Sequence, residues 1–362
     1  MTGPTSGEAP LLSARSVCKY FPVGAGNPFR RSRDRLCAVE DVSLEIYPGE
    51  TLGLVGETGC GKSTLARCLS RLYDLTSGQV IFNGRDISTL SRRELRPVRR
   101  EMQMIFQDPY GSLNPRRRVG SIIGDALAIH GIDDSAGRKK GVQELMELVG
   151  LNPEHYNRFP ADFSGGQRQR IGVARAVALR PKLIVCDEPV SALDVSIQAQ
   201  VINLLRDLQD ELDLTYLFIT HDLSVVRHVS DRIAVMYLGQ IVETAPTDSI
   251  FEETRHPYTR ALLSALPPAD PDTADSRERI VLVGDLPSPV HPPTGCRFHP
   301  RCPKAQPDCV QVEPPLEPVL ADGPDHRTAC LHPLEAGEVL TQAVPTIEDT
   351  ELRPDAVGGT GG

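Results

Sequence analysis

The chain has 362 residues, of which 40% are hydrophobic and 24% charged, and its formal net charge is −9 at pH 7. This length suffices for one full-sized core and a smaller appended domain. The acidic balance argues against a dedicated nucleic-acid-binding protein, which normally carries a basic domain. We find no run of 18 apolar residues and no basic segment followed by an apolar one at the N-terminus, so we expect a chain that is neither exported nor membrane-spanning.

The N-terminal part predicts a β-rich lobe around one buried strand. After about nine residues rich in Gly, Pro, Ser and Thr, which we expect to be disordered, two segments alternate like antiparallel strands. A short apolar run then leads into a glycine-rich loop and a helix, and a further strand ends at the turn Asn83-Gly84. The strands are expected at residues 14–21, 38–46, 51–55 and 80–82, and the helix at 64–69.

The rest of the chain alternates between helices and apolar strands. Helical periodicity covers about 90–180, apart from a loop dense in turn-forming residues at 108–115. Strands and helices then follow in the order that gives a parallel sheet with right-handed crossovers, whose ligands bind at the carboxyl ends of the strands. We expect strands at 183–186 and 215–220, a hairpin at 233–243, and helices at 197–212 and 257–266.

Residues 56–63 read Gly-Glu-Thr-Gly-Cys-Gly-Lys-Ser, between the strand at 51–55 and the helix. This is a P-loop in its strand-to-helix setting, where backbone amides and the helix N-terminus surround phosphate oxygens. Lys62 reaches the terminal phosphates, and Ser63 is a ligand for Mg²⁺. The motif predicts a nucleoside triphosphate as the ligand.

Polar side chains at other strand ends supply the remaining chemistry of hydrolysis. Asp187 ends the apolar run 183–186 and is expected to hold Mg²⁺, while Glu188 is placed to deprotonate the attacking water. Gln107 follows Met104-Ile105-Phe106 and is an expected ligand of Mg²⁺ or water. His221 ends the strand 215–220 and is expected to bond the γ-phosphate.

A second phosphate-binding helix terminus is predicted at Ser164-Gly165-Gly166-Gln167. Ser164 is a good N-cap, and two glycines let backbone amides approach an anion. One nucleotide needs only one such terminus, so we expect this second one to grip the nucleotide of another chain, with ATP joining the two subunits.

In their order and approximate spacing, these motifs resemble those of ABC transporter ATPases over residues 14–250, with a D-loop at 191–194. The resemblance implies an α/β fold: a P-loop NTPase core with a mainly parallel sheet, an antiparallel β subdomain, an inserted helical subdomain and a small Cys-containing C-terminal extension. An aromatic residue that stacks on adenine is expected near the first strand, with Tyr20 as the first choice and Phe21 as its rival. The expected catalytic residues are Lys62, Gln107, Glu188 and His221, and the expected contacts to ATP and Mg²⁺ are Tyr20, Gly56, Glu57, Thr58, Gly59, Cys60, Gly61, Lys62, Ser63, Thr64, Gln107, Ser164, Gly165, Gly166, Gln167 and Asp187.

Three further segments, at 107–115, 256–262 and 284–289, resemble the oligopeptide/dipeptide importer ATPases, and the F-type partner more than the D-type. This resemblance implies a peripheral ATPase on the cytoplasmic face of the membrane, with two permease subunits, a second ATPase subunit that is expected to be distinct, and indirectly an extracytoplasmic solute-binding protein. Nickel and glutathione importers share much of the pattern, so the solute stays open. A DNA-repair or chromosome ATPase is disfavoured, because only about one hundred residues separate the P-loop from the signature. The expected domains are 11–255, with a helical subdomain at about 108–180, then the extension 256–335 and a disordered tail 336–362.

Nine cysteines, an odd number spread through a phosphate-binding core, favour a reducing compartment over a disulfide framework. Four of them, Cys296, Cys302, Cys309 and Cys330, gather in the extension. Thiolates so grouped suggest a metal site, and similar peptide-importer ATPases carry a [4Fe-4S] cluster at such cysteines. Zinc, with His299 or His326 as a substitute ligand, and free thiols are the alternatives.

Overall fold

A computed structural model of the chain describes residues 9–23, 34–132, 135–266, 280–319 and 322–340, apart from 324 and 339. Residues 1–8 of the expected N-terminal disordered segment, and the expected disordered tail apart from 336–338 and 340, lie outside this part of the chain. None of the helices in it is long and apolar enough to cross a bilayer.

Twelve strands form two sheets in the described residues. The smaller sheet has the order β2-β1-β4-β5, and the larger has the order β11-β12-β10-β9-β3-β8-β7-β6. The strands are β1 (Leu12–Pro22), β2 (Arg35–Ile46), β3 (Thr51–Val55), β4 (Ser77–Phe82), β5 (Arg85–Asp86), β6 (Met102–Ile105), β7 (Leu183–Asp187), β8 (Thr215–Thr220), β9 (Arg232–Tyr237), β10 (Gln240–Pro246), β11 (Glu317–Pro318) and β12 (Arg327–Thr328).

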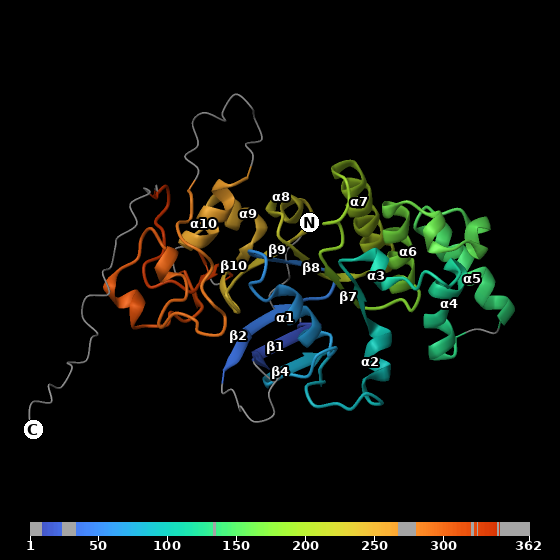
Figure 1. Cartoon of the computed structure of the whole chain (residues 1–362), viewed down its shortest axis with the longest axis horizontal. Helices are drawn as coiled ribbons and strands as arrows, with labels where there is room; N and C mark the ends of the chain where they lie inside the picture. The colour runs from blue at the N-terminus through green and yellow to red at the C-terminus, as the bar shows by residue number, and fades with distance from the viewer. Residues whose placement is uncertain are drawn as a thin grey trace, which may run out of the picture.

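The helices follow the strand-to-helix alternation predicted from the sequence. The α-helices are α1 (Lys62–Leu69), α2 (Leu95–Glu101), α3 (Pro109–Ser112), α4 (Val119–His130), α5 (Ser135–Leu148), α6 (Gly165–Val177), α7 (Val195–Leu212), α8 (Leu223–Val229), α9 (Thr247–Glu252) and α10 (Pro257–Ser264). Short 3₁₀ helices are η1 (Pro153–Asn157), η2 (Pro160–Asp162), η4 (His299–Arg301) and η5 (Pro307–Val310). In Figure 1, α4, α5 and α6 lie at one end of the molecule and the C-terminal extension at the other, with the two sheets between them.

The centre of the large sheet is parallel: β6 pairs with β7, β7 with β8, β8 with β3 and β3 with β9. Its strands are apolar on both sides because each face meets a core. In β7, Ile184 and Cys186 belong to one buried cluster, while Leu183 and Val185 belong to the other. This is the pattern of parallel strands covered on both faces. It confirms the mainly parallel α/β core and leaves the carboxyl ends of the strands free to form a site.

The extension joins the same sheet through β12, which pairs antiparallel with β10 at Glu243 and Thr244. Glu243 is fully buried, and its carboxylate accepts hydrogen bonds from the backbone N–H of Arg255, the hydroxyl of Thr254 and the Nε2 of His326. Asp322 in turn pairs with the guanidinium of Arg255. A buried carboxylate is stable only with such partners, so this network fixes the extension to the core.

We predict that Glu243→Ala lowers the free energy of unfolding by about 3 kcal/mol or more, because each buried donor left unpaired costs about 1–3 kcal/mol. Urea-induced unfolding of the purified chain measures the change. The control is Glu144→Ala, which removes an exposed carboxylate 3.7 Å from Lys140 and should change stability by no more than about 0.5 kcal/mol. Equal effects of the two substitutions would contradict the assigned role of Glu243.

Candidate active site

The loop at residues 56–63 turns sharply between β3 and α1. Gly61, the residue before α1, has φ +111°, and a Cβ at this position would lie 2.2 Å from the backbone oxygen of Ala38, so only glycine fits. The Nζ of Lys62 donates to the backbone oxygens of Gly56 at 2.7 Å and Glu57 at 3.0 Å. The loop therefore surrounds its own lysine at a helix N-terminus, which is the arrangement that binds phosphate.

Oxygen donors for a divalent cation meet beside this loop. The hydroxyl of Ser63, in the first turn of α1, donates to Oδ1 of Asp187 at 2.7 Å. Burial raises the pKa of the Asp187 carboxyl, and the hydrogen bond from Ser63 and the charge of Arg67 oppose this rise. A hydroxyl and a carboxylate in contact are the hard oxygen ligands that suit Mg²⁺, so these two residues fit the predicted metal.

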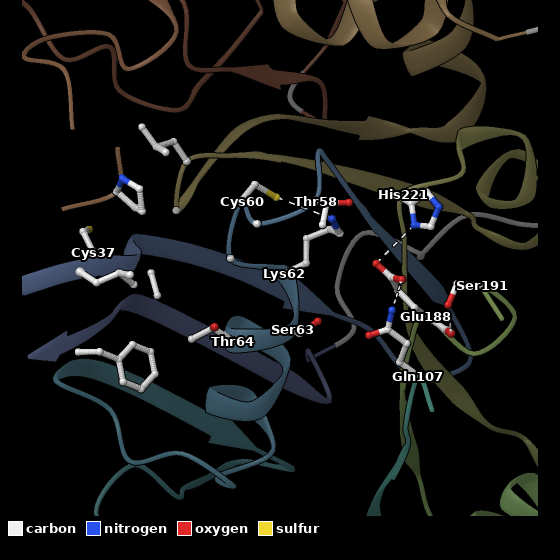
Figure 2. A pocket seen from close by; sticks show the side chains of 18 of the residues that line it. Cys37, Thr58, Cys60, Lys62, Ser63, Thr64, Gln107, Glu188, Ser191 and His221 are labelled. Atoms are coloured by element: carbon white, nitrogen blue, oxygen red, sulfur yellow. Dashed lines mark hydrogen bonds and ion pairs between the residues drawn. The ribbon is translucent and has the colours of Figure 1, made fainter. Parts of the chain in front are cut away.

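Glu188 lies directly after β7 and has two polar neighbours. Its backbone is left-handed, with φ +47°, a conformation that non-glycine residues adopt rarely and mainly at functional sites. The Nε2 of Gln107 donates to Oε2 of Glu188 at 2.7 Å, and the Nδ1 of His221 lies 3.4 Å from Oε1. Figure 2 shows Gln107 and His221 pointing toward Glu188. Three residues predicted separately from strand ends are thus in contact.

Most of these side chains border one cavity of about 690 Å³, a volume within the usual range for small-molecule sites. Residues 58–64, Gln107, Glu188 and His221 line it, together with Ser191 of the predicted D-loop. Gly56 and Glu57 lie beneath Lys62, and Asp187 is buried behind Ser63. The cavity continues to an apolar side lined by Phe21, Leu36, Cys37, Ala38, Leu238, Gly239 and Pro289.

The two candidate aromatic residues lie differently. Phe21 lines the cavity, and its ring packs edge-on against Tyr73, with the centroids 5.8 Å apart. Tyr20 does not line the cavity as described, and its hydroxyl donates to Oε1 of Glu40 at 3.2 Å. The position of the rings favours Phe21 over Tyr20 as the residue that meets a base.

The second predicted phosphate-binding terminus lies apart from this cavity. Ser164 caps α6: its backbone N–H donates to Gln167 Oε1, and Gln167 N–H donates to the Ser164 hydroxyl. A Cβ on Gly166 would lie 2.4 Å from a methyl carbon of Ile197. None of the four residues Ser164–Gln167 lines the cavity described above, so this terminus does not reach the P-loop of its own chain.

The four cysteines of the extension gather around one small cavity, together with His256, Phe298 and His299. Burial raises the pKa of Cys302 and of Cys330 to about 12, and every cysteine in the described residues is free. His326 is placed elsewhere, beside Glu243 and Asp322. The sequence expectation that His326 is a substitute zinc ligand is therefore wrong, because the network at β10 holds its ring.

Sequence reasoning missed the contribution of the extension to the nucleotide cavity. Pro289 lines the cavity, and its backbone oxygen accepts from the N–H of Cys37 at 2.9 Å. Arg301 pairs with Glu57 of the P-loop at 2.8 Å. No local sequence motif could predict these contacts, because the two residues of each contact are more than 240 positions apart in the chain.

Family models match two parts of the chain: the ABC transporter model covers residues 39–191, and the model of the oligopeptide/dipeptide transporter C-terminal region covers residues 242–309. The oligopeptide transport ATP-binding protein AppF of Bacillus subtilis is 53% identical over 88% of this chain and 96% of its own length. The probable peptide ABC transporter ATP-binding protein y4tS of Sinorhizobium fredii is 49% identical over 93% of this chain and 94% of its own length.

Among solved structures, the dimeric bacterial ABC transporter cassette MJ0796 is similar, with a TM-score of 0.59 and 28% identity over 65% of this chain and 98% of that one. A dimeric post-hydrolysis state of the same cassette, bound to ADP and Pi, has a TM-score of 0.58. The cassette fold, the residues around the cavity and the two relatives agree: the chain belongs to the ABC transporter ATP-binding proteins, in the branch that carries the oligopeptide/dipeptide transporter C-terminal region.

Proposed function

We propose that this chain hydrolyses ATP to power the import of peptides through membrane permeases. The observation that carries the proposal is the meeting of Lys62, Ser63, Asp187, Glu188 and His221 at one edge of the parallel sheet. The similarity to oligopeptide transport ATP-binding proteins over most of both chains supports peptides as the solute class. Nickel, glutathione or another small solute is the alternative within the same ATPase role.

The residues suggest a division of labour in hydrolysis. Lys62 exchanges its backbone partners, the oxygens of Gly56 and Glu57, for phosphate oxygens. Mg²⁺, held by Ser63 and Asp187 and expected also at Gln107, would neutralise phosphate charge. Glu188 accepts the proton of the attacking water, and the amide of Gln107 and the ring of His221 fix its carboxylate and respond to the γ-phosphate.

The catalytic site is completed by a second ATPase subunit in this proposal. The Ser164–Gln167 terminus is exposed at its cap and lies away from the cavity of its own chain, and the similar cassettes are described as dimers. We infer a head-to-tail pair in which Ser164, Gly165 and Gly166 of each subunit face the γ-phosphate held by the other. A distinct partner, giving a heterodimer, is the arrangement expected from the resemblance to F-type subunits.

The proposed assembly places this chain at the cytoplasmic face of the membrane as a peripheral subunit. Two permease subunits bind it there, and an extracytoplasmic solute-binding protein delivers the peptide without contacting this chain. The turn-rich segment after Gln107, which contains α3, is the proposed receiver of the permeases' cytoplasmic helices. No nucleic acid takes part.

We predict that Glu188→Gln lowers ATP hydrolysis by about 10²–10⁴-fold, the contribution typical of a general base, while ATP binding is retained. Incubated with Mg-ATP, this variant should form a stable dimer, alone or with the companion ATPase, as measured by size-exclusion chromatography with light scattering. Glu211→Gln, an exposed carboxylate on α7, is the matched control and should keep full activity. A variant that stays strictly monomeric in both mixtures would rule out the shared site.

Reconstitution tests the transport role. In proteoliposomes with the permeases and the companion ATPase, we expect ATP hydrolysis to rise severalfold when a peptide-loaded solute-binding protein is added, and labelled peptide to accumulate. Nickel or glutathione in place of peptide separates the alternatives. Hydrolysis that is indifferent to every permease and binding protein would count against import.

We also propose that Cys296, Cys302, Cys309 and Cys330 hold a [4Fe-4S] cluster. All four cysteines line one small cavity in the described residues, and none of them forms a disulfide. His256 supports this too, because its Nε2 is buried without a hydrogen-bond partner and its ring lines the same cavity, where an N–H donor would suit a sulfur acceptor.

Anaerobically purified protein should contain about four iron atoms per chain and absorb visible light, as expected of such a cluster. Cys302→Ser should lose most of the iron, and Cys18→Ser, at a half-buried cysteine outside the extension, should retain it. Metal analysis by mass spectrometry distinguishes the outcomes. A colourless sample with one zinc and no iron would replace the cluster by zinc, and a metal-free sample would leave only thiols.

A further inference from the structure

Glu57, the second residue of the P-loop, has its polar groups occupied from outside the loop. Its carboxylate accepts two hydrogen bonds from the guanidinium of Arg301, at 2.8 and 3.1 Å. Its backbone N–H donates to the hydroxyl of Tyr258 at 2.9 Å, and its backbone oxygen accepts from Lys62. Both Arg301 and Tyr258 belong to the extension and not to the P-loop core.

The two anchoring side chains are themselves held firmly. Tyr258 is fully buried and Arg301 is 8% exposed. The ring of Tyr258 packs against Tyr237 and Phe298, with centroid distances of 4.7 and 5.3 Å. Burial disfavours the charge of Arg301, but Glu57 and Tyr237 outweigh it and raise the pKa of the guanidinium. A bidentate pair of arginine and carboxylate fixes both distance and orientation.

The loop between Cys296 and Cys302 reaches the nucleotide cavity at a second point. Arg297 donates to the backbone oxygen of Leu238 at 2.6 Å and pairs with Glu40. Leu238 lines the apolar side of the cavity, while Arg301, four residues further on, holds the phosphate side. One segment of the extension thus contacts both ends of the site.

We propose that Arg301 and Tyr258 are positioning residues for ATP: through Glu57, they hold the backbone of the P-loop in the shape that binds phosphate. Neither side chain contacts the nucleotide cavity directly. Their effect passes through the peptide groups of Gly56 and Glu57, which also anchor Lys62. The inference rests on the ATP site of the proposed function, and small displacements of such a site cost large factors in rate or affinity.

The test measures the Kd of ATP by titration with a fluorescent ATP analogue, and the KM and kcat for hydrolysis, on the full chain with its companion ATPase. Arg301→Met and Glu57→Gln should each raise the Kd of ATP about tenfold. Because both substitutions break the same contact, the Kd of the double variant should not exceed the higher of the two single-variant values. Arg301→Lys should recover part of the affinity.

Tyr258→Phe, which keeps the buried ring, should raise Kd severalfold. In each variant KM should rise while kcat changes by less than about twofold, since Glu188 and Gln107 are untouched.

Arg260→Met is the matched control, because Arg260 is also a cation of the extension, but its guanidinium donates to the backbone oxygen of Glu338 and not to the P-loop. It should leave the Kd of ATP unchanged. Thermal unfolding of every variant separates a positioning role from a loss of fold. The inference is overturned if Tyr258→Phe and Glu57→Gln fold and bind ATP as wild type does, or if the effects of Glu57→Gln and Arg301→Met simply add. If wild-type protein itself bound no ATP, the proposed function would fail instead.

Discussion

The parallel pairing of β3, β6, β7 and β8 is the constraint on which the site depends. Parallel strands end at the same edge of a sheet, so the P-loop after β3, Gln107 after β6, Glu188 after β7 and His221 after β8 must meet there. The register sets their contacts: Glu188 N–H bonds the backbone oxygen of Ile219, two residues before His221. Segments up to 165 positions apart in the chain therefore contribute to one cluster of polar residues, although no single sequence motif contains them all.

The same edge shows how far sequence could predict the site. The P-loop, Asp187 and Glu188 are local patterns with a chemical meaning, and their strand-end positions follow from apolar runs of four or five residues. The contacts among Gln107, Glu188 and His221 follow from the sheet order, which the strand-helix alternation predicts. Tyr20 and Phe21 could not be separated in this way. Neighbours on a strand point to opposite sides, and the irregular pairing of β1 with β2 around Lys19 and Tyr20 decides which ring meets the cavity.

The extension was harder to predict because its contacts are non-local and polar. Proline-rich sequence with two short two-residue strands gives no periodic signal, yet β12 adds to the core sheet at Glu243. A buried carboxylate such as Glu243 looks, in sequence, like any exposed residue of a strand. His326 illustrates the consequence. Its position among cysteines suggested a metal ligand, but its ring bonds the carboxylate of Glu243 instead. A buried carboxylate without hydrogen-bond donors carries a large free-energy cost, whereas a histidine that binds no metal carries none of comparable size.

The loop from Cys296 to Cys302 of the extension makes contacts on two sides. Phe298, His299 and the four cysteines line one small cavity, while Arg297 and Arg301 of the same loop bond Leu238 and Glu57 beside the nucleotide cavity. A loop this short cannot change its path on one side without moving the other, because both arginines are buried and bonded. If the thiols hold a metal group as proposed, that group would also act on the geometry of the loop that holds Glu57. Because protein interiors are closely packed, we expect a displacement of the loop from Cys296 to Cys302 to displace Arg301 and, through it, Glu57.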